Sequence, residues 1–218
     1  MIVVIDGPAG SGKSSTARAV AQELNIQYLD SGALYRAATY LFLKSEQSLP
    51  MFFESLYSAQ LNFEFNEEFQ VTLNAENITS AIRTPEVSAH VSTIAAMPKV
   101  REFINALMNK AVQHDVFIAD GRDLGTAVFP SAECKFFMIA DLETRAKRRH
   151  LEHNSKGIQM SYTEVIAEFK KRDLIDSTRE KDPLKQADDA ILVDSSAFSF
   201  DEQVQYIVKK IKETIIIE

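Results

Sequence analysis

The sequence holds few of the features on which several protein classes depend. Cys134 is the only cysteine in 218 residues, so no internal disulfide can form, which fits a reducing cytoplasm. No apolar run approaches the roughly 20 residues that a membrane-spanning helix requires. Lysine and arginine total 24 against 31 acidic residues, a formal net charge of −7 and the wrong sign for coating a nucleic-acid backbone. We therefore expect no membrane and no nucleic acid among its partners.

The overall composition fits one large globular domain. Hydrophobic residues make up 45% of the chain and charged residues 25%, which supplies a buried core without a disulfide or a structural metal. The apolar run 2–5 follows Met1 directly, with no basic leader, so we expect no signal peptide and a cytoplasmic location. We also expect the protein to be a monomer.

Glycine is scarce as well, and its seven positions are concentrated. Three of them lie within residues 7–12, Gly32 stands in an Asp-Ser-Gly-Ala stretch, and Gly121 and Gly125 flank an Arg-Asp-Leu stretch. Glycine is used where the backbone bends sharply or approaches a ligand closely. This concentration predicts that three glycine loops share one site.

Five short apolar runs predict the strands of a parallel sheet. They are continuous rather than alternating, which is typical of strands covered by helices on both faces. Segments of helical periodicity lie between them, and this favours a doubly wound α/β fold. The runs are 2–5, 26–29, 116–119, 136–140 and 190–193. An aspartate follows each run, and the three glycine loops fall where ligands bind in such sheets, beyond the carboxyl ends of the strands.

One stretch between the second and third runs has a different period. Hydrophobic and polar residues alternate over 61–79, with turn-type residues at 66–68 and 74–77. This period of two predicts a small antiparallel sheet inserted into the core. After it, Thr84 followed by Pro85 predicts the start of a helix.

Residues 7–14 match the phosphate-binding pattern G-x-x-x-x-G-K-[ST] at every fixed position, between a strand and a helix-compatible segment. The backbone N–H groups of such a loop wrap an anionic phosphate, and the positive end of the helix assists. We expect Lys13 to reach the outer phosphates and Ser14 to meet Mg²⁺, although Ser15 or Thr16 could serve the ion instead. The loop residues expected to bind the nucleotide are Gly7, Pro8, Ala9, Gly10, Ser11, Gly12, Lys13, Ser14 and Ser15.

The rest of the sequence favours a kinase over a nucleotide hydrolase. The Asn-Lys pair at 109–110 continues as Ala-Val, so the guanine-reading Asn-Lys-x-Asp is missing, and Asp120 is followed by Gly121 rather than a water-polarising glutamate. Several arginines near loop and helix ends suit a substrate that carries its own phosphate. A phosphate oxygen is already anionic, so its phosphorylation needs positioning and charge neutralisation rather than a general base.

More specific motifs follow the phosphate loop in order along the chain. The most specific are D-S-G-A-L-Y-R at 30–36 and D-G-R-D-L-G-T at 120–126, accompanied by I-R-T-P-E-V at 82–87, P-K-V-R-E at 98–102 and K-R-D-x-x-D-x-x-R at 171–179. Together they resemble the bacterial-type cytidylate kinases, a family within the nucleoside monophosphate kinases.

This resemblance implies a fold, a domain layout and a reaction. The fold is α/β: a P-loop kinase core with a five-stranded parallel sheet, a monophosphate-binding insert that holds the small antiparallel sheet, and a short lid. The layout is a core of 1–40, 97–147 and 166–218, an insert of about 41–96 and a lid of about 148–165. The reaction is Mg²⁺-dependent transfer of the γ-phosphoryl group of ATP to CMP and dCMP. A sibling kinase for UMP, shikimate or dephospho-coenzyme A, and a non-catalytic nucleotide sensor, are the alternatives.

The resemblance also implies a set of charges for the transfer step. Lys13, Arg122 and Arg179 take catalytic roles, together with an arginine from the start of the lid. Three arginines share a face of the predicted lid helix: Arg145, Arg148 and Arg149. Of these we expect Arg148 to contact phosphate, although a solvated basic face is the alternative.

The remaining implied roles concern the acceptor nucleotide. Asp123 would accept from the cytosine amino group, while Arg101 and Ser92 would donate to N3 and O2. Arg172, Asp176 and Arg179 are spaced to share a helix face, where a salt-bridge ladder is the alternative to a ligand contact. The residues expected to bind the acceptor are Ser31, Tyr35, Arg36, Ser92, Arg101, Arg122, Asp123, Arg172, Asp176 and Arg179.

Overall fold

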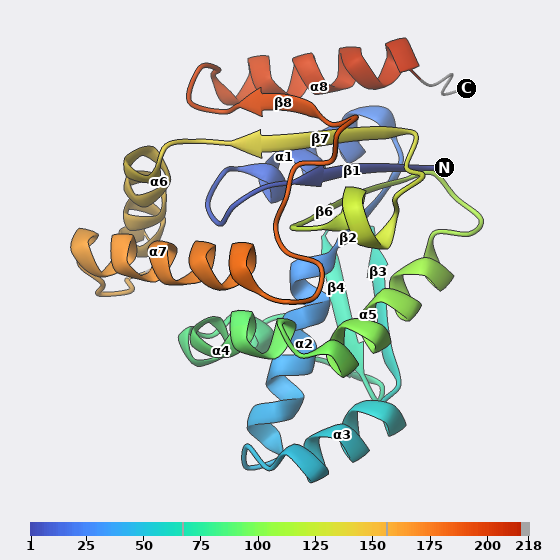
Figure 1. The fold of residues 1–218 in the computed structure, drawn as a ribbon, viewed down its shortest axis with the longest axis vertical. Coiled ribbons are helices and arrows are strands. Elements are labelled where there is room, and N and C mark those ends of the chain that lie inside the picture. Colours follow the sequence, from blue (N-terminus) through green and yellow to red (C-terminus); the bar gives the residue numbers. More distant parts are fainter. Residues whose placement is uncertain (67, 156, 215–218) are drawn as a thin grey trace.

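A five-stranded parallel sheet forms the centre of the molecule (Figure 1). The computed structural model describes residues 1–66, 68–155 and 157–214. The strands lie in the order β2-β6-β1-β7-β8, and every neighbouring pair is parallel. Their bounds are β1 Ile2–Asp6, β2 Gln27–Asp30, β6 Phe117–Gly121, β7 Cys134–Ile139 and β8 Ile191–Asp194. All five predicted strands are confirmed, with ends that differ by a residue or two.

The burial of each strand follows from its place in the sheet. All residues of β1 and β6 are buried, because these strands lie inside the sheet and helices cover both faces. β8 is an edge strand, and its Leu192 is 51% exposed. The apolar runs 2–5 and 116–119 therefore form inner strands of the sheet, and the carboxyl ends of these strands border the cleft described below.

Helices connect the strands and surround the sheet (Figure 1). In the described chain their bounds are α1 Lys13–Leu24, α2 Ser31–Lys44, α3 Leu49–Ser58, α4 Pro85–Ala95, α5 Pro98–Ala111, α6 Leu142–Ser155, α7 Tyr162–Thr178 and α8 Phe200–Thr214. A short 3-10 turn spans Ala81–Arg83 and a π-helical turn spans Leu124–Val128. As predicted, Thr84 caps α4: its side chain accepts from the backbone N–H of Val87, and Pro85 is the first helical residue.

The predicted antiparallel sheet is present and has three strands in the order β3-β4-β5. Their bounds are β3 Leu61–Phe65, β4 Phe69–Leu73 and β5 Glu76–Asn77. Of the first expected turn, 66–68, residue 67 lies outside the described part of the chain. Tyr28 of β2 makes edge-to-face contacts with Phe65 and Phe69, at centroid distances of 5.4 and 5.8 Å. These aromatic rings join the small sheet to the core, so one apolar core runs through both.

The lid segment expected at 148–165 is largely helical in the described residues. α6 continues to Ser155, and α7 begins at Tyr162 behind a capping box in which Ser161 and Glu164 each bind the other's backbone N–H. Residue 156 of this segment lies outside the described part. α6 and α7 pack against each other beside the carboxyl edge of the sheet (Figure 1).

Candidate active site

A cleft of about 490 Å³ opens at the carboxyl ends of β1, β2 and β6. Its walls include Gly10 and Gly12 from the first glycine loop, Gly32 from the second and Gly121 from the third. The structure therefore brings the three glycine loops to one site. They meet there because parallel strands end at the same edge of the sheet.

The phosphate loop between β1 and α1 can turn only because it contains glycine. Gly7 has φ +154°, and a Cβ there would lie 2.1 Å from the carbonyl oxygen of Met138. Gly10 has φ +75°, and a Cβ there would lie 2.7 Å from the Phe169 ring. Ala9, Gly10, Gly12, Lys13, Ser14 and Ser15 line the cleft, and Gly7, Pro8 and Ser11 complete the turn outside its walls. The N-terminus of α1, with its free N–H groups, thus faces the cleft.

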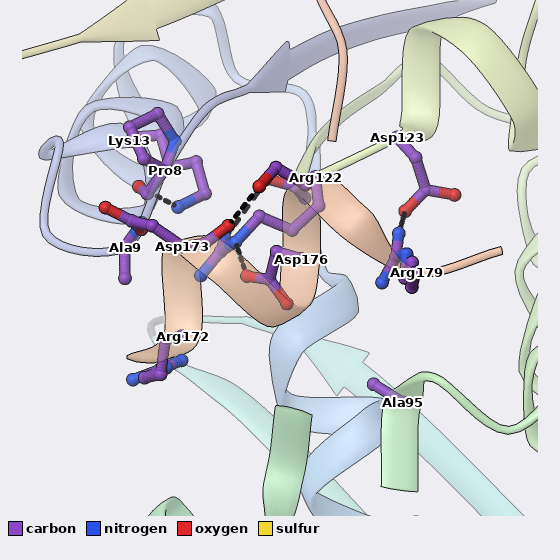
Figure 2. Close-up of polar contacts among 12 residues, drawn as sticks. Pro8, Ala9, Lys13, Ala95, Arg122, Asp123, Arg172, Asp173, Asp176 and Arg179 are labelled. Carbon is purple, nitrogen blue, oxygen red and sulfur yellow. Dashed lines mark hydrogen bonds and ion pairs between the residues drawn. The ribbon is translucent and has the colours of Figure 1, made fainter. Parts of the chain in front are cut away.

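Lys13 folds back across this loop. Its Nζ donates to the carbonyl oxygen of Pro8 at 3.0 Å (Figure 2), and only 5% of the residue is exposed. Burial, followed by the positive charge of Arg122, lowers the pKa of Lys13 from its usual 10.5 to about 7. An anion in the cleft would offset both effects and favour the charged ammonium group.

Binding of a polyphosphate such as ATP in the cleft is therefore expected to take up protons above neutral pH. At pH 8 Lys13 is largely neutral in the free protein, because its pKa is about 7, and the polyphosphate restores the charged form. Calorimetry in buffers of different ionisation enthalpy should show an uptake approaching one proton per ATP at pH 8 and much less at pH 6. Lys13→Met should abolish the difference between the two pH values. An equal uptake in that variant would contradict the assignment to Lys13.

Ser14 and Asp120 form the part of the site that suits a divalent cation. Ser14 Oγ donates to Asp120 Oδ2 at 2.7 Å, and Tyr28 donates to the other carboxylate oxygen at 2.6 Å. Burial raises the pKa of Asp120, so a cation there would favour its ionised form. Thr16 is committed elsewhere, since its hydroxyl donates to the carbonyl oxygen of Gly12 at 2.9 Å. Of the adjacent hydroxyl groups, that of Ser14 thus faces the carboxylate.

The cleft is strongly basic although the protein is acidic overall. Among its described walls are nine arginines and Lys13, against five carboxylates. The arginines are Arg18, Arg36, Arg83, Arg122, Arg145, Arg148, Arg149, Arg172 and Arg179. Such a concentration of cations in a chain of net charge −7 predicts a ligand with several negative charges.

Two of these arginines, Arg36 and Arg122, reach the cleft from different elements. Arg36 of α2 donates to Ser88 Oγ at 2.8 Å, and burial, reinforced by the charge of Arg172, lowers the pKa of its guanidinium to about 10. Arg122, directly after β6, pairs with Asp176 of α7 at 2.9 Å, as Figure 2 shows. These side chains come from segments far apart in sequence and converge on one space.

The expected helix face of Arg172, Asp176 and Arg179 requires a correction. α7 ends at Thr178, so Arg179 follows the helix instead of continuing its face. Arg172 pairs with Glu168 at 3.6 Å, whereas Asp176 turns to Arg122. The salt-bridge ladder therefore does not form among these residues, because the carboxylate in the middle is drawn to a partner on another element.

A buried charge cluster lies at the other end of the cleft. Asp123 accepts from Arg179 at 2.5 Å through one carboxylate oxygen and from Arg101 through the other. Arg101 has no exposed surface, so it lies behind Asp123 rather than in the cleft wall. Ser92 lines the cleft near this cluster, but the Tyr35 hydroxyl points away and donates to Asn105 at 3.1 Å. Ser31 also lines the cleft, while its hydroxyl donates to the backbone carbonyl of Asp120 at 2.6 Å.

The arginines of α6 divide their contacts between the phosphate loop and its neighbours. Arg148 donates to Ser195 at 3.0 and 2.8 Å, and Ser195 donates to the carbonyl oxygen of Ser11. Arg145 is more deeply buried and donates to the carbonyl oxygen of Ala9 at 2.8 Å. Arg149 pairs with Glu152 at 3.2 Å. Arg145 thus braces the loop, whereas Arg148 stands beside it at the cleft.

Three carboxylates that support the site were not identified from the sequence. Asp6 accepts from the backbone N–H groups of Leu124 and Gly125, at 3.0 and 2.7 Å, which ties the third glycine loop to β1. Asp173 accepts from Arg145 at 2.7 Å, and Asp182 accepts from Arg101 at 3.0 Å. The sequence shows an aspartate after each strand and acidic residues in the 171–182 segment, but it does not show which groups these carboxylates bind. Their partners depend on tertiary packing, for which the spacing gives no signal.

Comparison with known proteins gives consistent matches over nearly the whole chain. Residues 3–213 match the family model described as cytidylate kinase. The cytidylate kinase of Carboxydothermus hydrogenoformans is 44% identical over 213 residues, which cover 96% of each chain, and that of Lactococcus lactis is 43% identical over 215 residues, which cover 97% of each.

Solved structures share the fold at much lower identity. A protein from Thermus thermophilus superposes with a TM-score of 0.52 at 17% identity, over 99% of this chain and 98% of that one. A protein from Eubacterium ventriosum gives a TM-score of 0.53 at 13% identity, over 98% of each chain. Separately, no helix in the described ranges combines the length and apolar character that crossing a bilayer demands.

Proposed function

The chain belongs to the cytidylate kinase family, so it transfers the γ-phosphoryl group of ATP to CMP, and we propose that the basic cleft is where both nucleotides bind. The matches do not favour a sibling kinase with another acceptor or a non-catalytic sensor. The observation that carries the proposal for the cleft is its reversed charge: ten cationic side chains line it in a protein of net charge −7. Two nucleotides that bring their phosphates together require such a site.

In this proposal the donor side consists of the phosphate loop and α1. The loop N–H groups and Lys13 bind the ATP phosphates, and Arg148 approaches them from α6. Ser14 and Asp120 would hold Mg²⁺, since hydroxyl, carboxylate and phosphate oxygens are the ligands that this ion prefers. The described residues include no group of three acidic, histidine or cysteine side chains that could hold a metal alone, so the ion would share the nucleotide phosphates. When bound, it would neutralise charge on the transferred group.

The acceptor side consists of the arginines of α2, the third glycine loop and α7. Arg36 and Arg122 bind the CMP phosphate, Arg172 and Asp176 lie near its ribose, and Arg179 bridges toward the transferred group. Asp123 accepts from the cytosine amino group, with Ser92 as a further contact and Arg101 behind the carboxylate. dCMP is a second acceptor in the proposal, because neither the phosphate contacts nor the base contacts need a 2′-hydroxyl group.

The layout of the chain and its setting are further parts of the proposal. The insert of about 41–96 would close on CMP and the lid of about 148–165 on ATP, which excludes water from the transfer. Exclusion of water matters here because an activated phosphoryl group would otherwise be hydrolysed. A monomeric state and a cytoplasmic location stay predictions.

An acceptor panel tests the proposed function directly. ADP release is measured with ATP and Mg²⁺ against CMP, dCMP, UMP, AMP and GMP. We expect the highest kcat/KM with CMP, dCMP next, and UMP lower by about 100-fold or more, because uracil sets a carbonyl oxygen against the Asp123 carboxylate. Equal rates with UMP would contradict the base contact. Tight ATP binding without ADP release for any acceptor would contradict the enzyme.

A further inference from the structure

Asp182, in the loop that follows α7, contacts Arg101 and Arg179, the two buried arginines that bind Asp123. Its carboxylate Oδ2 accepts from Arg101 Nε at 3.0 Å, and its backbone carbonyl accepts from Arg179 Nε at 2.7 Å. The same two arginines bind the two carboxylate oxygens of Asp123. One residue outside the cleft wall therefore holds both partners of the residue proposed to read the base.

The backbone of Asp182 is in an uncommon conformation for this position. Its φ is +52°, in the left-handed region, and Pro183 follows, whereas a residue before proline normally adopts an extended conformation. The bond from Leu184 N–H to the carbonyl oxygen of Asp176, at 2.7 Å, closes the loop around it. Strained conformations persist where several contacts require them, and they cluster at functional sites. Here the strain lets Asp182 direct its carbonyl and its carboxylate at two arginines.

The charges of this cluster balance only when Asp182 is included. Arg101 and Arg179 carry two positive charges, and Asp123 and Asp182 carry two negative charges. Arg101 has no exposed surface, so protein acceptors rather than water set the direction of its guanidinium group. Without the Asp182 carboxylate, Arg101 would have Asp123 as its one carboxylate partner, whereas Arg179 would keep the backbone carbonyl of residue 182. The Asp123 oxygen that faces Arg101 would then turn further toward it.

We propose that Asp182 is a positioning residue for cytosine recognition. It fixes Arg101 and Arg179 from behind, so that the Asp123 carboxylate keeps lone pairs directed at the cleft for the cytosine amino group. A carboxylate oxygen can accept more than one hydrogen bond, so contacts to the arginines leave room for the base. This inference rests on the proposed role of Asp123.

Two variants separate the carboxylate of Asp182 from its backbone. Asp182→Gly suits the left-handed backbone and so keeps the carbonyl contact to Arg179, but it removes the carboxylate. Asp182→Asn keeps the shape and an acceptor oxygen but removes the charge. Glu180→Gln is the matched control, because Glu180 is an exposed acidic residue in the same loop. Each variant is measured for kcat, for KM with CMP, UMP and ATP, and for thermal stability.

We expect Asp182→Gly to raise KM for CMP about tenfold, with Asp182→Asn intermediate, since a hydrogen bond to a charged group is lost. KM for ATP and kcat should stay within about twofold, and the preference for CMP over UMP should fall, because UMP does not use the Asp123 acceptor.

Glu180→Gln should match the unmodified protein throughout. An unchanged CMP-to-UMP ratio in both Asp182 variants would overturn the proposal, and so would a parallel rise of KM for ATP and CMP with lower stability. If Asp182→Gly fails to fold, the ratio in Asp182→Asn decides in the same way. Absence of CMP phosphorylation in the unmodified protein would instead refute the proposed function.

Discussion

Replacing Lys13 by methionine is expected to lower kcat for CMP phosphorylation by about 100- to 1,000-fold, the usual effect of removing one preorganised charge at the reacting centre. Methionine keeps the unbranched apolar stem of the side chain and removes only the terminal ammonium group, together with its hydrogen bond to the carbonyl oxygen of Pro8. The rate is measured by ADP release at saturating ATP and CMP. Lys209→Met is the control, since Lys209 lies on α8 with its side chain 73% exposed.

Stability measurements distinguish this loss from misfolding. The folded-state pKa of Lys13, about 7, lies below the usual 10.5, so the unfolded chain binds more protons between these values. The contribution of Lys13 to the free energy of unfolding therefore increases as the pH rises from about 7 toward 10.5. At neutral pH or below, Lys13 is charged and buried, and this opposes folding. Lys13→Met should be at least as stable as the unmodified protein at pH 7. A variant that keeps more than a tenth of kcat would contradict a catalytic role for Lys13.

The sequence contained enough to predict the core and its ligand-binding edge. The innermost strands, β1 and β6, are buried throughout, so each appears as a continuous apolar run whatever its neighbours are. The turn of the phosphate loop requires glycine at fixed positions, and a sequence motif contains these positions. Gly7 is one of them, because a Cβ there would collide with the carbonyl oxygen of Met138. These features depend on local chain geometry and on the layering of an α/β sheet, and both leave a signature in the order of residues.

The contacts within the site could not be predicted in the same way. Arg122 meets Asp176 across 54 residues of sequence, and Arg101 meets Asp182 across 81. Helical spacing predicted that Asp176 pairs with Arg172 or Arg179, but in the structure Asp176 pairs with Arg122, which follows β6. Whether a side chain lies in the cleft wall or behind it, as Arg101 does, is decided by packing between elements. The family resemblance supplied the residues of the site, and the structure supplied their partners.

The ion pairs of Asp123 with Arg101 and Arg179 change the result expected for the Asp123→Ala variant. From the base contact alone, Asp123→Ala should affect CMP and leave UMP nearly unchanged. Because Asp123 also binds Arg101 and Arg179, the change removes a carboxylate from two buried cations. Breaking a buried pair in this way costs about 3–5 kcal/mol of folding free energy. Some loss with UMP is therefore expected, through Arg179 and through the lower stability.

For Asp123→Ala we expect kcat/KM to fall by about 1,000-fold with CMP and by about tenfold with UMP, since the base contact and the arginine contacts are both lost with CMP but only the latter with UMP. The measurement is kcat/KM with each acceptor, together with a thermal-unfolding curve that locates a temperature at which the variant is fully folded. Asp188→Ala, at an exposed position, is the control and should change neither ratio nor stability. If Asp123→Ala reduced both acceptors by the same factor, Asp123 would act only through its arginines, and the base would be read elsewhere in the cleft.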